Sequence, residues 1–193
     1  MAKMTYIGHG SLRFVADEGK TVYVDPYWEG DYSLPADLIL VTHQHHDHNQ
    51  VDKVTQQAGC RIITEADALA GGTHNSFDLG WIQIDSVLAN NKNHDPKLCV
   101  GYILAFDGLK IYCAGDTSTT ADMKKMRGID YALLPIDGIY NMDAAEATQC
   151  AHTIDAKRSI PIHTDPTGYS EDKVAQFTPK SRLVIRHSET IDL

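Results

Sequence analysis

Residues 43–48 read His-Gln-His-His-Asp-His, and this run constrains the fold and the chemistry of the chain more than any other segment. The stretch directly before it, Asp37–Thr42, is apolar and β-branched and predicts a buried strand. The polar run therefore leaves the carboxyl end of a strand, where a sheet can hold it in place. Imidazole and carboxylate together suit zinc, iron or manganese rather than calcium, so we favour a metal site over a histidine-rich surface loop. The candidate ligands are His43, His45, Asp47 and His48.

Three further candidate ligands also follow apolar strands. Asp116 comes after Ile111–Gly115, and its two oxygens could bridge two cations, with an N-cap of the next helix as the alternative. His163 follows an apolar strand in the same way, with a structural histidine as the alternative. His94 lies in a polar loop after an expected strand, and an exposed loop histidine is its alternative. The remaining histidines, expected to lie outside the site, are His46, His74, His152 and His187.

The composition is that of an acidic globular protein. At 193 residues the chain fits one domain with a sizeable core, and its formal charge of −9 argues against binding to long nucleic acid. The chain starts without the apolar segment of a signal peptide and contains no stretch long enough for a membrane span, so we expect a cytoplasmic protein with no membrane contact. The four cysteines lack CxxC spacing and are expected to be reduced. The oligomeric state stays open, and a homo-oligomer is compatible with the sequence.

Hairpin patterns followed by strand–helix alternation appear in both halves of the chain. Strands are expected at 4–8, 11–16, 21–25, 37–42, 61–64, 77–87, 100–106, 109–114, 131–135, 159–162 and 182–185. Helices are expected at 51–58, 65–70, 119–126, 144–154 and 170–177. This order predicts an α/β (α+β) protein in which two sheets pack face to face with helices outside, as a four-layer αββα sandwich.

In this order the motifs resemble those of the metallo-β-lactamase fold superfamily, along the whole chain. Within it the chain is most similar to the small, single-domain metal-dependent hydrolases akin to ascorbate-6-phosphate lactonase-type enzymes. The resembling segments are Ile7–Ser11, Val24–Pro26, the 43–48 run, His94–Pro96, Val100–Tyr102, Ile111–Thr117, Leu134–Gly138, Glu146-Ala147 and Ile160–His163. They are specific for the fold and unspecific for the substrate.

The resemblance implies a centre of two divalent metal ions, zinc first among them and otherwise manganese or iron. One ion would be held by His43, His45 and His94, and the other by Asp47, His48 and His163. Asp116 would bridge them. The two ions would share a hydroxide that attacks the substrate, with Asp47 as a catalytic residue that orients it and passes a proton.

Seven more residues are candidates for supporting the ligands or contacting the substrate. His9 lies between two glycines, Asp25 ends an early strand, and Lys92 would meet an anionic substrate. Tyr140 and Asn141 follow a strand end. The branch often has glycine where this chain has Asp137, and Glu146 has a capping-box role as its favoured alternative.

The leading hypothesis is a hydrolase of a small, anionic ester, lactone or phosphodiester. A phosphodiesterase or nuclease acting on nucleotides would use the same metals. A metal-binding sensor without turnover is the non-catalytic alternative.

Overall fold

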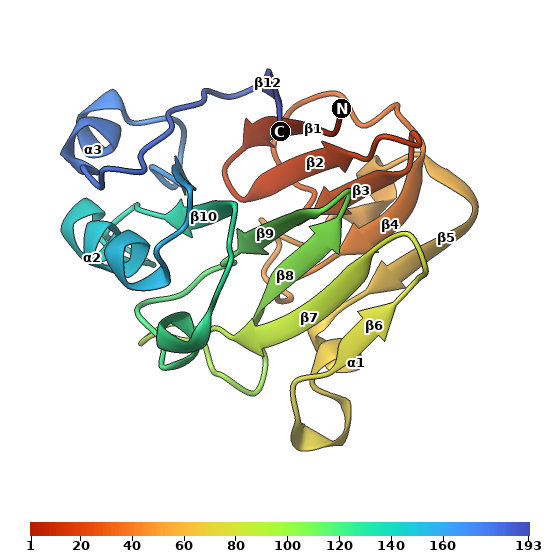
Figure 1. Cartoon of the computed structure of the whole chain (residues 1–193), viewed down its shortest axis with the longest axis horizontal. Helices are drawn as coiled ribbons and strands as arrows, with labels where there is room; N and C mark the ends of the chain where they lie inside the picture. Colours follow the sequence, from red (N-terminus) through yellow and green to blue (C-terminus); the bar gives the residue numbers. More distant parts are fainter.

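Two six-stranded sheets lie face to face in the computed structural model, which describes residues 1–193 (Figure 1). The first sheet has the order β12-β1-β2-β3-β4-β5 and the second the order β11-β10-β9-β8-β7-β6. In the first sheet the strands are β1 (Lys3–Gly8), β2 (Ser11–Val15), β3 (Thr21–Val24), β4 (Ala36–Leu40), β5 (Gln56–Ile63) and β12 (Glu189–Asp192). In the second they are β6 (Ser76–Asp78), β7 (Gln83–Leu88), β8 (Val100–Phe106), β9 (Leu109–Cys113), β10 (Tyr131–Pro135) and β11 (Arg158–Ile162).

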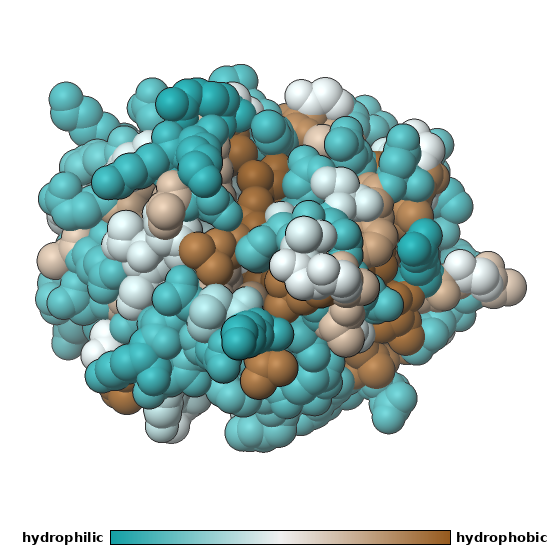
Figure 2. Space-filling view, turned by 90° about the horizontal axis from the view of Figure 1, so that it is seen from below, coloured by the Kyte–Doolittle hydropathy of each residue, from teal (hydrophilic) through white to brown (hydrophobic).

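The helices are few and lie outside the sheets. They are α1 (Glu65–Ala68), α2 (Ala144–Ile154) and α3 (Glu171–Gln176), with 3-10 turns η1 (Val51–Lys53), η2 (Ala70–Gly72) and η3 (Asp122–Lys125). Figure 1 shows α2 and α3 beside the part of the second sheet that contains β10. None of the helices has the length and apolar content needed to cross a membrane. The face drawn in Figure 2 is mainly hydrophilic, with hydrophobic side chains in furrows between polar ones.

Period-two alternation along the strands explains the layers. Phe14, Leu40 and Tyr102 belong to the large core between the sheets. On the outer side of the second sheet, Leu134 packs with the buried face of α2. Outside the first sheet the covering layer is thin, and Tyr32 belongs to a small cluster there. The predicted two-sheet sandwich with outer helices is confirmed.

The topology brings the carboxyl ends of several strands to one edge. β3, β4 and β5 run parallel in the first sheet, and β9, β10 and β11 run parallel in the second. In open parallel sheets ligands bind beyond the carboxyl ends of the strands. The predicted ligands follow the ends of β4, β9 and β11, so the fold gathers them at this edge.

Two sequence predictions about elements are wrong. Residues 51–58, expected to be helical, form the 3-10 turn η1 and the start of β5. Pairing of Ala36 with Gln56 in the parallel ladder overrides the local helical pattern. The strand expected at 182–185 is irregular and contributes one isolated bridge between Ser159 and Arg182. The polar segment β12 closes the first sheet instead, because it satisfies the open backbone edge of β1.

Two other elements differ in extent from their predictions. The helix expected at 119–126 is reduced to the 3-10 turn η3. The strand expected at 77–87 is divided into β6 and β7 by a turn in which Gly80 has φ +83°. The hairpin at Asp107-Gly108 is present as predicted, with both residues at positive φ, and all four cysteines are free.

Candidate metal centre

A group of three histidines forms the first half of the centre. His43 and His45 come from the loop after β4, and His94 comes from the loop between β7 and β8. Their ligand-competent nitrogens lie within 4.8 Å of one another, and His43 Nε2 is 3.1 Å from His45 Nδ1. His43 and His94 are buried, whereas His45 is exposed to the cleft above them. The structure thus brings together the three residues expected at one metal.

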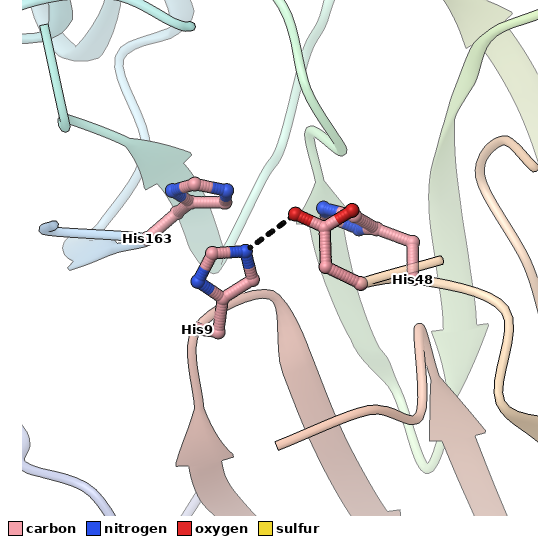
Figure 3. A group of neighbouring side chains, drawn as sticks. His9, His48 and His163 are labelled. Carbon is pink, nitrogen blue, oxygen red and sulfur yellow. Dashed lines mark hydrogen bonds and ion pairs between the residues drawn. The ribbon is translucent and has the colours of Figure 1, made fainter. Parts of the chain in front are cut away.

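The second half contains the other predicted ligands and one additional histidine. Asp47, His48 and His163 have ligand atoms within 4.8 Å of one another, and His9 belongs to the same group. Figure 3 shows His9 and His163 side by side, and its dashed line marks the contact of 3.2 Å from His9 Nε2 to Asp47 Oδ2. The ring centroids of His9 and His163 are 3.6 Å apart. His9 is therefore part of the site wall.

Asp116 lies between the two halves. Its Oδ1 is 3.4 Å from His48 Nε2, and its Oδ2 is 3.3 Å from His94 Nε2 and 3.7 Å from His163 Nε2. One carboxylate thus faces imidazoles from both groups. This is the position that a bridging ligand requires.

Asp25 orients one histidine of each half, His48 directly and His43 through Thr42. His48 Nδ1 donates to Asp25 Oδ2 at 2.8 Å, and Thr42 Oγ1 donates to the same oxygen at 2.7 Å. Since the Thr42 proton is used in that bond, Thr42 Oγ1 accepts from His43 Nδ1 at 3.0 Å. Both rings therefore carry their proton on Nδ1 when neutral and present Nε2 to the centre.

Two further oxygens orient the remaining buried rings. His94 Nδ1 donates to Asn91 Oδ1 at 2.8 Å, and His163 Nδ1 lies 3.1 Å from Asp137 Oδ2. The Nε2 atoms of His48, His94 and His163 are buried without a hydrogen-bond partner. On each of these rings Nδ1 lies beside an oxygen, and Nε2 is buried and faces the Asp116 carboxylate. Metal-bound histidines usually hold an oxygen with the nitrogen that does not bind the metal, so these rings fit divalent metal ions.

The backbone around the centre adopts strained conformations and approaches the rings closely. His9, Asp25 and His163 have φ values of +54°, +47° and +45°, in the left-handed region that non-glycine residues seldom occupy. A Cβ at Gly10 would lie 2.7 Å from His48 Cε1, so only glycine lets the β1–β2 turn approach this ring. Strain of this kind clusters at functional sites.

The charges of the centre are strongly coupled. Burial alone would lower the pKa of His48, but the Asp116 and Asp25 carboxylates outweigh it and raise the pKa to about 9. Burial would raise the pKa of Asp116, but His48 and His163 hold it well below its usual range. Burial lowers the pKa of His43 to about 2. Without metal at neutral pH, His48 is therefore an imidazolium paired with Asp116, whereas His43 is neutral.

The other sequence candidates divide into two groups. Tyr140 lines a cleft of about 560 Å³ above the centre, and Asn141 Nδ2 donates to Asp137 Oδ2 at 2.7 Å. Lys92 is exposed and does not line this cleft. Glu146 lies outside it and accepts hydrogen bonds from the backbone and hydroxyl of Thr119, while its own N–H donates to the N-cap Asp143.

Several residues that support the site were missed in the sequence. Thr42 and Asn91 orient His43 and His94, respectively. Both have a side-chain oxygen and stand close before these histidines in the sequence, which could have indicated their role. Trp28 stacks on His9 with ring centroids 5.9 Å apart, and no local pattern indicates this contact. His46 is exposed but lines the cleft above the centre, whereas the sequence placed it outside the site.

Replacing His9 with alanine is expected to lower activity about tenfold, within the range typical for loss of a partner of a metal ligand. Burial would raise the pKa of Asp47, and the hydrogen bond from His9 is the strongest of the contacts that instead lower it. Without His9 the carboxylate loses this fixed orientation. Steady-state kinetics and metal content should be measured beside His152→Ala, which removes an exposed histidine on α2, outside the cleft. Equal activities of the two variants would contradict a role for His9.

Comparison with known proteins agrees with this geometry. A family model described as the beta-lactamase superfamily domain matches residues 3–163. The chain belongs to this superfamily. A UPF0173 metal-dependent hydrolase of Ligilactobacillus salivarius is 32% identical over 186 residues, covering 83% of this chain and 84% of the relative. Another from Thermococcus onnurineus is 29% identical over 191 residues, covering 84% of each.

A solved structure is also similar to this chain. A candidate metal-dependent hydrolase from Parabacteroides distasonis superposes with a TM-score of 0.80 at 29% identity, covering 96% of this chain and 93% of its own. The chain is thus a member of the metal-dependent hydrolases of the metallo-β-lactamase superfamily, in agreement with the resemblance read from its motifs.

Proposed function

We propose that this superfamily member hydrolyses a small ester or lactone at a centre of two divalent metal ions. His43, His45 and His94 would hold one ion. Asp47, His48 and His163 would hold the other, with Asp116 shared between them. The observation that carries the proposal is the set of three buried Nε2 atoms that lack a hydrogen-bond partner and surround the Asp116 carboxylate. Nitrogen and carboxylate donors favour zinc, with manganese or iron as alternatives.

Bound metals would supply Lewis acidity and lower the pKa of a water molecule toward neutrality. Asp47 lines the cleft, and its side chain is 28% exposed, so it can reach both solvent and substrate. Its lowered pKa keeps it ionised at neutral pH, which suits a carboxylate that accepts a hydrogen bond from the attacking water and so orients it. The hydrogen bond from His9 fixes the carboxylate in this orientation.

The test is a substrate screen with the metal-loaded protein. We expect hydrolysis of 4-nitrophenyl esters or simple lactones, with little action on bis-4-nitrophenyl phosphate. The reverse preference would replace the proposal with a phosphodiesterase. Metal uptake without turnover of either class would support the sensor that the sequence left open.

Metal binding is expected to release protons and to strengthen as the pH rises toward 9. The pKa of His48 is raised to about 9, so its ring carries a proton at pH 7 that ligation through Nε2 must displace, and the Asp116 carboxylate shifts the pKa of His163 in the same direction. His43, with a pKa of about 2, has no proton to release. Titration calorimetry in buffers of different ionisation enthalpy measures the release directly. Zinc binding with no proton release at pH 7 would contradict these ligand assignments.

A further inference from the structure

The cleft above the centre continues into a second hollow, and the two share several walls. The first, here called the metal lobe, has about 560 Å³ and includes Tyr27, Asp47, Tyr140 and Pro166 in its wall. The second, here called the side lobe, has about 260 Å³ and lies beside His43. Both lobes are lined by Gln44, His45, Asn93 and His94. A substrate placed at the metals can therefore extend along either lobe.

The charged residues in these walls are all acidic, apart from the titratable histidines. Asp47 and Asp116 line the metal lobe, and Glu65 and Asp95 line the side lobe, whereas no lysine or arginine lines either one. The two aspartates of the metal lobe face the centre and would be balanced by bound metal. The two acids of the side lobe have no such counter-charge.

Glu65 is the most restricted of these acids. It is only 8% exposed, at the start of α1. Its Oε2 accepts a hydrogen bond from Gln44 Nε2 at 2.8 Å, and its Oε1 has no hydrogen-bond donor. Gln44 is itself held, since its Oε1 accepts from Asn49 Nδ2 at 3.1 Å. The side lobe thus has a fixed carboxylate in its wall and a neutral amide beside it.

The cations around the cleft are either paired or outside its walls. Lys173 Nζ lies 3.0 Å from Asp165, and Lys53 Nζ lies 3.5 Å from Glu29 on a ring face of Tyr27. Lys92 and Lys97 are exposed on the loop that contains Asn93, but neither lines a lobe. The polar lining consists instead of amides, phenols and imidazoles, which recognise uncharged hydrogen-bonding groups.

We propose that the site selects substrates whose portion beyond the reacting bond is uncharged or cationic, and that it discriminates against anionic ones. This inference rests on the proposed metal-dependent hydrolase and replaces the anionic substrate expected from the sequence. An anion in the side lobe would meet Glu65 and Asp95 without a compensating cation, and such like-charge contacts are a common device of specificity. Esters or lactones with a neutral or amine-bearing tail are the chemical class that fits.

Hydroxamates with matched tails test this selection independently of turnover. Butyrohydroxamic acid, glutaric monohydroxamic acid and 4-aminobutyrohydroxamic acid share a metal-binding head and have neutral, anionic and cationic tails, respectively. Their Kd values would be measured by calorimetry on the zinc-loaded full chain at pH 7. We expect the anionic tail to bind at least about tenfold more weakly than the neutral tail, and the cationic tail at least as tightly as the neutral one.

Charge variants identify the source of the preference. Asp95→Lys should reduce the ratio of the Kd of the anionic tail to the Kd of the neutral tail severalfold. Glu18→Lys makes the same charge change in an exposed turn outside both lobes and should leave this ratio unchanged. Anionic tails that bind as tightly as neutral ones would overturn the inference while leaving the metal centre intact, most clearly if Lys92→Ala then weakened them. If none of the three binds the zinc-loaded chain, the proposed function and this inference both fail.

Discussion

Replacing Asp116 with asparagine is expected to abolish the proposed two-metal centre while leaving the fold intact. Asparagine keeps the shape of the side chain but removes the charge that faces His48, His94 and His163. Even the loss of an outer partner of a ligand costs about 10–100-fold in metal affinity or activity, and a shared ligand should exceed that range. Metal content, steady-state rate and circular dichroism would be measured on the same preparation.

A matched control for this substitution exists at the opposite ends of the strands. Asp130 is also a buried, ion-paired carboxylate, 2.6 Å from Lys157, but it precedes β10 instead of following a strand at the site edge. Asp130→Asn should retain both metals and the wild-type rate. Retention of two metals and full activity by Asp116→Asn would show that the bridging assignment is wrong.

The second large effect is expected from Asp25→Ala, which should weaken both halves of the centre and the fold. The substitution leaves three donors without their acceptor, namely His48 Nδ1, Thr42 N and Thr42 Oγ1. Each buried donor without a partner costs about 1–3 kcal/mol, so the free energy of unfolding should fall by several kcal/mol. Since Thr42 in turn orients His43, metal affinity should fall about 10–100-fold at both positions.

Denaturant unfolding with and without chelator separates these two consequences. The loss of stability should persist in chelator, because the three donors are unsatisfied even in the metal-free protein. Asp25→Asn is the conservative comparison, since its amide oxygen can accept and asparagine tolerates the φ of +47°. If Asp25→Ala weakened only one of two metals, the link through Thr42 to His43 would be refuted.

The sequence carried most of the information on where the site lies. Four polar ligands directly after an apolar strand must lie where that strand leaves the core. The run 43–48 is therefore expected at the carboxyl end of the strand before it. The same logic applied to Asp116 and His163, and the parallel topology brings all three segments to one edge. His94 was harder to predict, since it is placed by a loop that Asn91 and Tyr140 hold together.

Contacts between loops were beyond the reach of local patterns. The pairing of His9 with Asp47 depends on a left-handed turn between glycines, which a sequence can only hint at. The start of β5 was mistaken for a helix because its residues are exposed and polar, and pairing with β4, not local propensity, decides its conformation. β12 was missed for the same reason, since it forms a strand by pairing with the edge of β1 and has no local strand pattern.

The metal content of the purified chain tests the central claim most directly. Protein prepared without added metal or chelator would be analysed by inductively coupled plasma mass spectrometry, alone and after reconstitution with zinc, manganese or iron. The account predicts close to two equivalents of metal per chain in the wild type and a clear deficit in Asp116→Asn. A wild-type chain that binds no metal even after reconstitution would contradict the ligand set and the hydrolase mechanism built on it.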